Sequence, residues 1–566
     1  MNRWPIAFIL LGLIAAGLAY DQVVEISPAE SSVSGTETVV TPAVGDPARL
    51  DGAWFCPVGS SDVGGFADHT VNISNFGEEP AVANLSILTA DGPGPARRID
   101  LAPFSTERVK LSDTQVVDVA AAVVEVTGGK GAVGHTVTTA EGVAEGPCAT
   151  NASNTWYFAA GRTTRDSTQY LALMNPFPET AVFDVEFQAA TRSREPGPLQ
   201  GAFVRARSVR IIEVGEFVAP EEALATKITT ARGRLVVERL QLLDGELGSS
   251  GAALQLGVPS PAQSWIFTAG RVHEGGDDLL TIFNPFEVSE VVPTTTDGDD
   301  TEEEVESVVD EQEGFTTVAV ELWPTNPADL SNFSVVTIER EIRPGTFATI
   351  DLRAQAERFE FPLPYELGVN VTSLEGLPIV AERWQFAERL LVDGVDPVPP
   401  PVEPEPEPEE VEADPDNPET ADGEGADAGA DEGGGAALLE LQPPEPVDSG
   451  LPQPLPTAGL STTRGNELFS TRWLIPWVTV VDDSTLISVA AIEEAAVEVL
   501  VLNGGQLEGP TRATVSAGGR AIIPLASNSG GAAVEIRASR PVSVESVVVL
   551  PDESLDVVPA IPTVDS

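Results

Sequence analysis

A pattern of three short blocks recurs along the chain, and it limits the possible folds more than any other feature. In two clear copies a tryptophan block is followed by an apolar run ending in Asn-Pro-Phe and then by a Glu-Arg pair. The matching residues are Trp156 to Arg162, Asn175-Pro176 and Glu238-Arg239 in one copy, and Trp265 to Arg271, Asn284-Pro285 and Glu382-Arg383 in the other. Three matching blocks in one order predict tandem copies of a single structural unit.

Two further copies are weaker. The first opens at Trp54 and ends its second block at Asn75, without the proline. The fourth opens at Trp473 or Trp477 and closes around Glu545. We therefore expect four units of the same kind.

The unit has the pattern of β-strands. Phe183, Val185 and Phe187 alternate with polar residues, which predicts a strand with one buried and one wet face. Asn175-Pro176 ends the preceding strand, because proline cannot donate to a strand ladder. Each unit has roughly 80–90 residues and six or seven strands, which favours an all-β, antiparallel, immunoglobulin-like sandwich. Short helices are expected at residues 220–225 and around 352–358.

Two acidic segments interrupt the units. Residues 290–314 form an insertion in the third unit, and residues 393–456 are rich in Pro, Glu, Asp, Gly and Ala. Both are expected to be disordered, and the second to hold the fourth unit at a distance. The predicted divisions are 1–20 for a membrane segment, 21–50 for a stalk, 51–150, 151–258 and 259–392 for three sandwiches, 393–465 for a linker and 466–555 for the fourth sandwich.

The N-terminal stretch predicts export. No charge lies between Trp4 and Tyr20, Arg3 precedes this stretch, and the next basic residue is Arg49. The positive-inside rule then places everything after Tyr20 outside the cytoplasm. Gly17-Leu-Ala19 also fits a cleavage site, so a single-pass membrane anchor and a removed signal peptide, which would give a secreted protein, both stay open.

Charge and cysteine content limit the partners and the compartment. The formal net charge is −57, which makes nucleic acid and anionic lipid poor partners. In the oxidising compartment that export implies, Cys56 and Cys148 are expected to form a disulfide. Such a bridge would stabilise the fold by about 4–5 kcal/mol in the chain-entropy model.

The sequence offers no catalytic motif that we recognise. His69, His135 and His273 belong to no known constellation and are interpreted as ordinary strand or surface residues. The acidic runs at 297–300 and 482–483 lack the spacing of a calcium loop. We therefore predict no catalytic residue, no metal site and no cofactor.

The repeated charges suggest a structural role. We hypothesise that Glu238 pairs with Arg162 and Glu382 with Arg271, which would lock the first strand of a unit to its last. The alternative is that these charges line a ligand groove. Trp54, Trp156 and Trp265 are interpreted as core anchors, with sugar platforms as the alternative for the tryptophans of the two clear copies.

The three blocks resemble repeats of actinobacterial envelope and secreted proteins, in which they run approximately Trp-Tyr-Phe-Ala-Glu-Gly, Asn-Pro and Val-Glu-Arg-Pro. Over roughly residues 50–550 the chain looks like a member of an uncharacterised actinobacterial family of unknown function. It departs from the pattern where Ala160 replaces the usual glutamate and where Leu240 and Trp384 replace the usual proline. The resemblance implies location and architecture, and it carries over no functional residues.

The expectation for function follows from these points. We expect a non-enzymatic, exported cell-envelope protein that presents tandem β-sandwiches for structural, adhesive or protein–protein interactions. The alternative is a glycan-binding accessory protein of cell-wall polysaccharide assembly, and an enzyme of unfamiliar type comes third. The expected partner is an envelope protein or glycan, with the membrane contacted through the N-terminal helix.

Overall fold

The computed structural model describes residues 51–286, 314–326, 334–388, 460–466, 469–480, 485–525, 531–549 and 555–563, apart from residues 63, 362 and 504. The predicted membrane segment, the stalk, the acidic insertion and the acidic linker lie outside these residues. No helix within the described part of the chain is long and apolar enough to cross a membrane.

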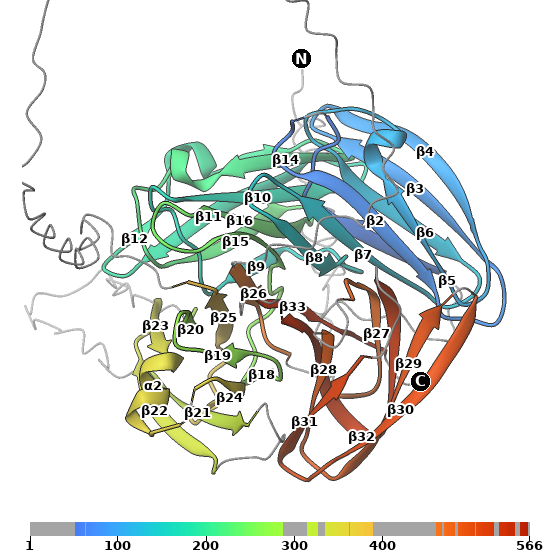
Figure 1. Cartoon of the computed structure of the whole chain (residues 1–566). Helices are drawn as coiled ribbons and strands as arrows, with labels where there is room; N and C mark the ends of the chain where they lie inside the picture. Colours follow the sequence, from blue (N-terminus) through green and yellow to red (C-terminus); the bar gives the residue numbers. More distant parts are fainter. Residues whose placement is uncertain are drawn as a thin grey trace, which may run out of the picture. The chain divides into compact units, whose positions relative to one another are not determined.

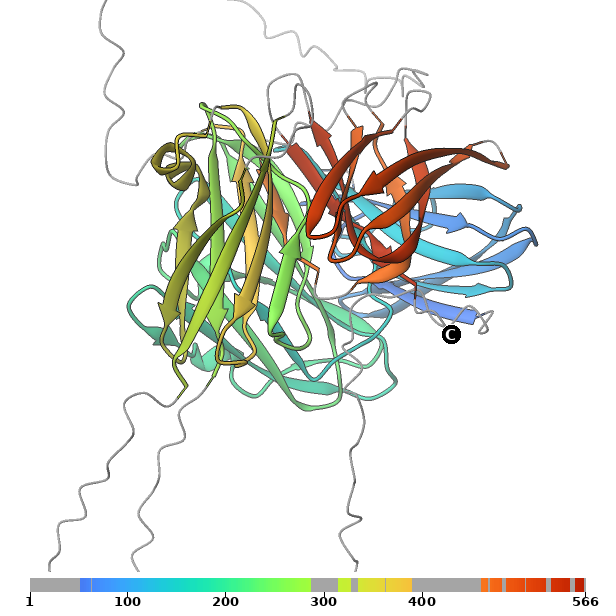
Figure 2. The ribbon, with the colours of Figure 1, turned by 90° about the horizontal axis from the view of Figure 1, so that it is seen from below.

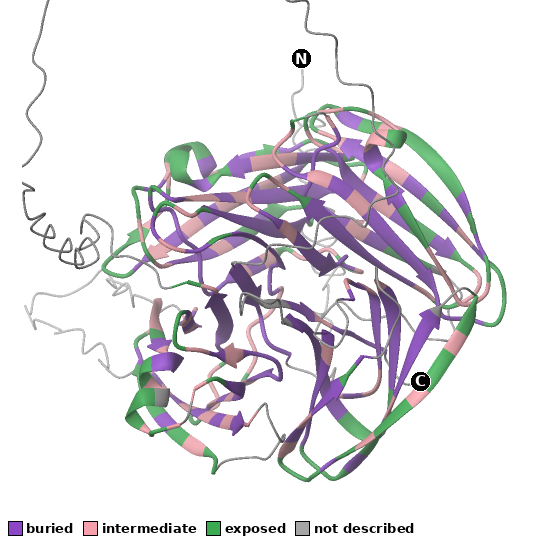
Figure 3. Cartoon of the chain, in the orientation of Figure 1, coloured by how far each residue is buried: buried purple, intermediate pink, exposed green. Residues whose placement is uncertain are grey.

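The described chain is almost entirely β structure (Figure 1). The alternation predicted for residues 181–189 is present in β11 (Ala181–Ala189), where Phe183, Val185 and Phe187 are buried and the residues between them are partly exposed. Figure 3 shows the same alternation of buried and exposed positions along other strands. Antiparallel sheets therefore face each other across apolar cores; the described sheets have four or five strands, except for the eight-stranded one in the C-terminal part.

Sandwich 1 consists of the sheets β1-β6-β3-β4 and β5-β2-β7-β8, all antiparallel. Its elements are β1 (Asp51–Cys56), β2 (Asp68–Asn75), β3 (Ala81–Thr89), β4 (Gly92–Leu101), β5 (Ser105–Lys110), the 3-10 helix η1 (Leu111–Asp113), β6 (Ala121–Thr127), β7 (Gly131–Thr138) and β8 (Val143–Pro147).

Sandwich 2 repeats this pairing with the sheets β9-β15-β11-β12 and β14-β10-β16-β17, and β13 also pairs with β11. Its elements besides β11 are β9 (Thr155–Phe158), β10 (Ser167–Asn175), β12 (Ser193–Arg194), η2 (Gly197–Leu199), β13 (Ala202–Val204), β14 (Ser208–Glu213), η3 (Val214–Glu216), β15 (Leu224–Arg232), β16 (Val236–Asp244) and β17 (Ser250–Leu256). The helix predicted at 220–225 is wrong, because this segment leads directly into β15.

Sandwich 3 has the sheets β18-β24-β21-β22 and β23-β20-β25-β26, with β19 paired to β24. Its elements are β18 (Ser264–Phe267), β19 (Arg271–Val272), β20 (Asp277–Asn284), β21 (Thr316–Thr325), β22 (Val336–Ile342), β23 (Thr346–Asp351), α2 (Leu352–Arg358), β24 (Tyr365–Ser373), β25 (Val380–Phe386) and β26 (Leu460–Thr463). The predicted helix at 352–358 is confirmed, and the Asp351 carboxylate caps it by accepting from the Ala354 amide.

Sandwich 4 follows the same order, except that one long strand, β32, passes through both of its sheets. The first half of β32 pairs with β27 and β29, and the second half pairs with β28 and β33. Its strands are β27 (Ser470–Val478), β28 (Thr485–Ala491), β29 (Ala495–Asn503), β30 (Gln506–Val515), β31 (Gly519–Pro524), β32 (Ala532–Val549), β33 (Leu555–Pro559) and β34 (Ile561–Pro562).

The strand order, which the sequence left open, differs from that of an immunoglobulin domain. In an immunoglobulin domain the first strand lies in the same sheet as the second, and the last strand lies beside the sixth. Here the first strand of sandwich 1 pairs with the sixth, and the seventh pairs with the second. The period of two identifies strands and their buried faces, but it carries no information about which strands become neighbours.

The four sandwiches belong to one compact unit, Pro42–Ser566. Their innermost strands contact one another in a closed cycle, β8 to β17, β17 to β26, β26 to β33 and β33 to β8. Figure 1 and Figure 2 show sandwich 4, in red and orange, beside sandwich 1 in blue.

The place of the acidic linker corrects the sequence-based boundaries. β26 lies beyond the 393–456 segment and pairs with β25, so the third sandwich takes its last strand from the far side of the linker. The linker is therefore an insertion within sandwich 3 and not a tether that holds sandwich 4 at a distance. Composition reveals that a segment lacks a core, but not whether the strands on either side of it pair.

Candidate functional site

The closing strands of the four sandwiches carry equivalent residues at the contacts between sandwiches. One position of the closing strand is equivalent in all four sandwiches, because it pairs with the equivalent residue of the second strand in each. This position is occupied by Gly134 in β7, Glu238 in β16, Glu382 in β25 and Glu545 in β32. The three glutamates are fully buried. A buried carboxylate needs partners to offset its lost hydration, and these partners lie in the neighbouring sandwich.

Each of these glutamates accepts hydrogen bonds from backbone amides of the preceding sandwich. Glu238 accepts from Val58 at 3.1 Å, and Glu382 accepts from Ala159 at 3.0 Å and Ala160 at 3.2 Å. Glu545 accepts from the amides of Thr268 at 2.6 Å and Ala269 at 2.8 Å. The tryptophan block of one copy is thus joined to the glutamate of the next copy.

The junction between sandwiches 4 and 1 obtains its carboxylate from another strand. A Cβ added to Gly134 would lie 3.1 Å from Cγ of Pro476, so this position is closed to a larger side chain. Glu145 on the adjacent strand β8 accepts instead from the amide of Thr479 at 3.3 Å and from its hydroxyl at 2.9 Å. Each of the four junctions therefore contains a buried carboxylate.

An arginine balances the charge at the junction between sandwiches 2 and 3. Nη1 of Arg239 lies 3.0 Å from Oε2 of Glu382 and also donates to the carbonyl of Ala160. The guanidinium lies 5.1 Å from the ring centre of Phe158 and 5.0 Å from that of Trp384. This cation is therefore buried, paired and in contact with two aromatic faces.

Histidines replace the arginine at the junction between sandwiches 1 and 2. Nε2 of His135 lies 2.9 Å from Oε1 of Glu238, and its Nδ1 lies 3.0 Å from Nε2 of His69. Nδ1 of His69 lies 2.7 Å from the carbonyl of Ala120 and must donate to it, so its Nε2 accepts from His135. His135 and Glu238 then share one further proton between them, because two acceptors cannot bind each other.

Burial and the neighbouring His135 lower the pKa of His69 to about 3, although its hydrogen bond to Ala120 acts in the opposite direction. In the unfolded chain a histidine titrates near 6.5. Between these values this histidine is protonated in the unfolded chain but not in the folded one, so its own contribution to stability falls as the pH falls.

We predict that this histidine makes the fold acid-sensitive. Between pH 7 and pH 5 the free energy of unfolding of the wild type should fall by about 2 kcal/mol more than that of His69→Gln. Burial raises the pKa of Glu145 and Glu545, which acts in the opposite direction above pH 4.5, and the comparison with the variant removes this contribution. Urea unfolding of the full chain at both pH values measures the difference. Asn151→Gln, at an exposed position without a titrating side chain, is the control and should keep the wild-type pH dependence.

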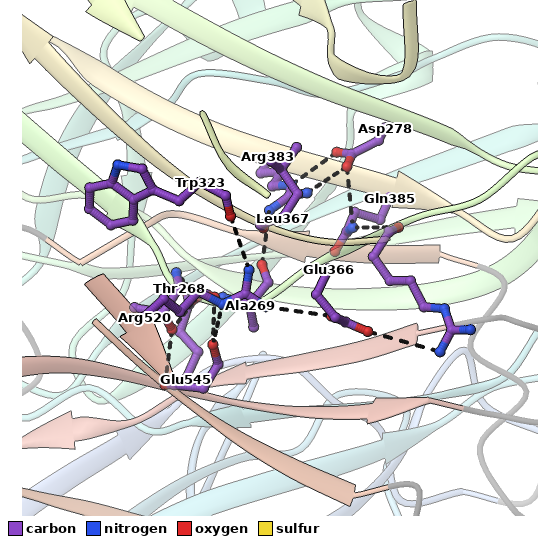
Figure 4. A network of polar contacts seen from close by, with 12 residues as sticks. Thr268, Ala269, Asp278, Trp323, Glu366, Leu367, Arg383, Gln385, Arg520 and Glu545 are labelled. Carbon is purple, nitrogen blue, oxygen red and sulfur yellow. Dashed lines mark hydrogen bonds and ion pairs between the residues drawn. The ribbon is translucent and has the colours of Figure 1, made fainter. Parts of the chain in front are cut away.

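A further polar network lies at the junction between sandwiches 3 and 4 (Figure 4). Arg383 makes a two-pronged ion pair with Asp278 at 2.9 and 2.5 Å, and it donates to the carbonyls of Ala269 and Leu367 at 3.0 and 2.7 Å. Arg383 therefore holds the backbone segment whose amides bind Glu545.

Arg520 of sandwich 4 extends this network. Its Nη2 lies 3.6 Å from Glu366 of sandwich 3, and its Nε donates to the hydroxyl of Ser488 at 3.1 Å. Burial lowers the pKa of Arg520 to about 10, against the opposing effect of Glu366. The side chain still carries its charge near neutral pH.

The ion pairs hypothesised from the sequence are wrong. Arg162 lies 3.7 Å from Asp166, and Arg271 lies 3.9 Å from Glu366, while Glu238 and Glu382 bind the neighbouring sandwiches as described. The closing strand is buried on both faces, so glutamate and arginine both point into protein. The sequence showed the recurrence of the pair but not that its partners come from another copy.

The tryptophans of the opening blocks lie in the cores. Trp54, Trp156 and Trp265 are buried, and Trp473 is their counterpart in sandwich 4. Nε1 donates from Trp156 to Leu235, from Trp265 to Ile379 and from Trp473 to Val542, each time to a backbone carbonyl just before or at the start of the closing segment. The tryptophan thus ties the first strand of each of these sandwiches to its last strands.

The asparagine of the Asn-Pro-Phe block fixes a turn. Nδ2 of Asn175 donates to the carbonyls of Glu179, Val204 and Arg205, and its Oδ1 accepts from Phe177. Asn284 makes the same kind of contacts in sandwich 3, where the residue after it is Pro285. Pro176 and Pro285 follow the ends of strands β10 and β20, as the sequence predicted.

The predicted disulfide is present. Cys56 and Cys148 are bonded, with their Cα atoms 4.7 Å apart, and the bridge joins β1 to the segment after β8. His135 offers a nitrogen within 4.8 Å of these sulfurs. Because both sulfurs are in the bridge, neither is a thiolate that this histidine could activate or that could bind a metal.

These features define a class of protein: an all-β chain of several sandwiches joined through buried carboxylates. The chain matches a family of unknown function, DUF5719, over residues 135–306, which run from the last strands of sandwich 1 into sandwich 3. No curated protein matches.

Two solved structures were also compared with the chain. The "Crystal Structure of Thermotoga maritima 1070" is 15% identical, with 19% of this chain and 99% of that chain covered and a TM-score of 0.17. A "tetra-tandem repeat in extending region of large adhesion protein" is 10% identical, with 91% and 100% covered and a TM-score of 0.09. At such TM-scores neither likeness supports a conclusion about fold or function.

Proposed function

We propose that this chain is a non-enzymatic, exported protein of the cell envelope, in which four sandwiches act as one rigid scaffold for interactions with other envelope components. In this proposal the N-terminal stretch either anchors the protein in the membrane or is removed as a signal peptide. Partners are then an envelope protein or glycan, and not nucleic acid.

The observation that carries the proposal is the closed cycle of contacts between sandwiches. Carboxylates at all four junctions bind backbone amides or hydroxyls of the neighbour, and they are buried. A carboxylate that stays buried at a junction without these partners is strongly unfavourable, so the contacts fix one geometry of each junction. The cycle therefore suits a fixed spacing of surfaces better than independent modules on a flexible string.

Export is tested with topology reporters in a bacterial host. Alkaline phosphatase fused after Ser566 should be active, because it needs an oxidising compartment, whereas a cytosolic reporter at the same place should be inactive. Removing residues 4–20 should reverse both results. Export would be contradicted if the cytosolic reporter were active and alkaline phosphatase inactive at this place in the wild type.

The scaffold role is tested by photo-crosslinking in the same host. A crosslinking amino acid at Ile492 or Val116, which are 65% and 61% exposed, should capture a defined envelope component. The Glu382→Gln substitution weakens one junction. With the crosslinking amino acid at Ile492 or Val116, this variant should capture less of the same envelope component than the wild type. Turnover of a substrate in broad hydrolase screening of the purified protein would contradict the non-enzymatic part of the proposal.

A further inference from the structure

Arginines gather at one end of sandwich 2, in a chain that is otherwise strongly acidic. Residues 151–258 hold 11 basic and 12 acidic residues, whereas the whole chain holds 31 and 88. Five of these arginines come from two neighbouring loops and the strands that bound them, and we refer to them as the arginine cluster. Its members are Arg205, Arg207, Arg210, Arg232 and Arg234.

Backbone and ring contacts bring the two loops together around Phe177. The amide of Arg207 donates to the carbonyl of Phe177 at 2.9 Å. The guanidinium carbon of Arg234 lies 4.9 Å from the ring centre of Phe177. Arg207 and Arg234 therefore both lie against the turn at Phe177, although they come from different loops.

Strand pairing fixes the other members. Val182 in β11 is opposite Phe203 on one side and Arg232 on the other, so these two residues are about 10 Å apart. Arg210 donates to the carbonyl of Phe203 at 3.4 Å. Arg205 follows Phe203 by two residues and is exposed, as are Arg207, Arg232 and Arg234. Four of the five arginines thus face solvent, and Arg210 is partly buried, with its guanidinium 5.5 Å from the ring centre of Phe183.

Side-chain hydrogen bonds from buried residues fix the backbone of the loop that carries Arg205 and Arg207. The buried side chain of Asn175 donates to the carbonyls of Val204 and Arg205 at 3.2 and 2.9 Å. The hydroxyl of Ser208 also donates to the carbonyl of Arg205, at 3.0 Å. The arginines are therefore presented on an ordered turn and a ligand need not order it.

Arg207 occupies a backbone position that favours glycine. Its φ is 49°, in the left-handed region, and its amide donates to the carbonyl of Phe177 in the turn after β10. The equivalent residues in the other sandwiches, which also precede the fifth strand, are Phe104, Gly345 and Gly518, with φ of 51°, 67° and 64°. Two copies use glycine here, so sandwich 2 carries an arginine side chain at a conformational cost.

Nearby carboxylates do not neutralise the cluster. Arg205 lies 3.5 Å from Asp91 of sandwich 1, but their side chains are 62% and 98% exposed, and such pairs contribute little. Glu179 is on the same turn and is exposed, and Asp184 follows Val182 on β11 and accepts from the amide of Gly201. Five guanidinium groups thus face three carboxylates.

We propose that the arginine cluster binds an anionic polysaccharide, with phosphodiester or carboxylate groups as the recognised chemistry. Guanidinium groups bind both of these anions with paired hydrogen bonds. Phe203, which is 54% exposed and whose carbonyl accepts from Arg210, offers an apolar surface to a sugar ring. The inference rests on the proposed function, because it names the chemistry of one envelope partner.

The charge of the whole chain favours a polysaccharide over nucleic acid. Duplex DNA carries one charge per about 1.7 Å, and a protein of net charge −57 repels such a polymer strongly. A polysaccharide with one charge per sugar has its charges farther apart and is repelled less. Five arginines within a small area can then offset the remaining repulsion locally.

The test is direct binding to the purified full-length protein, with oligogalacturonate as the carboxylate probe and oligo(glycerol phosphate) as the phosphodiester probe. Arg205→Gln/Arg207→Gln/Arg234→Gln should weaken binding of the preferred probe about tenfold or more. Arg97→Gln/Arg98→Gln/Arg512→Gln is the control. It removes three exposed arginines elsewhere, gives the same net charge and should bind like the wild type.

The single variant Arg207→Gly separates binding from folding. Glycine is the natural residue at this position in sandwiches 3 and 4, so the melting temperature should stay equal or rise while affinity falls. Wild-type affinity in Arg207→Gly and in the triple variant would overturn the inference, as would no binding of either probe or tighter binding of an oligonucleotide. Failed binding together with successful export in the reporter experiment would reject this site and leave the proposed function standing.

Discussion

Glu382→Ala should lower the free energy of unfolding by about 3–5 kcal/mol. The substitution removes the acceptor of the amides of Ala159 and Ala160 and leaves Arg239 as a buried cation without its carboxylate. Urea unfolding of the full chain measures the loss. Glu339→Ala, an exposed glutamate on β22 of the same sandwich, is the matched control and should change stability by less than about 0.5 kcal/mol.

A second substitution tests the reason for this loss. If an unpaired buried cation causes much of it, Arg239→Met in the Glu382→Ala background should recover part of the stability, because a methionine can lie between Phe158 and Trp384 without a charge. A double variant no more stable than Glu382→Ala would show that the loss comes from the other contacts of Glu382, with the amides of Ala159 and Ala160 and with Nε1 of Trp384.

Removing the disulfide should cost about 4–5 kcal/mol. The bridge closes a loop with a sequence separation of 92, and the chain-entropy estimate for a loop of this length lies in that range. Cys56→Ser/Cys148→Ser should therefore unfold at a lower urea concentration than the oxidised wild type. Reduction of the wild type should produce a similar shift and should leave the double variant unchanged. An unchanged midpoint in both cases would mean that contacts with sandwich 2 already hold these segments.

The sequence predicted those parts of the fold that have a local cause. The alternation of Phe183, Val185 and Phe187 follows from the strand period, and the tryptophans of the opening blocks are buried in the cores. The strand order could not be predicted, because pairing of the first strand with the sixth depends on contacts between distant segments. The same limit explains why β26 was assigned to a linker.

The candidate site was predicted in its residues but not in its geometry. Glu238 and Glu382 recur, which identified them as important, but within one copy arginines were the only obvious partners. The donors to these glutamates are backbone amides, such as those of Val58 and Ala159. Because every residue except proline has such an amide, the sequence does not show which ones serve as donors. His135 and Glu145 were missed for a related reason: each replaces a residue of another copy by a different chemical type. An alignment of the four copies by strand register would have revealed them.

The insertion of the acidic segment between β25 and β26 has a consequence for the integrity of the chain. A single protease cut in this segment would produce two polypeptides. The larger, N-terminal one would contain β25, and the smaller, C-terminal one would contain β26, which pairs with β25. The buried contacts of Glu545 with Thr268 and of Glu145 with Thr479 also cross the cut. The nicked molecule should therefore persist as a non-covalent heterodimer, and its two pieces could be encoded as separate genes and still assemble.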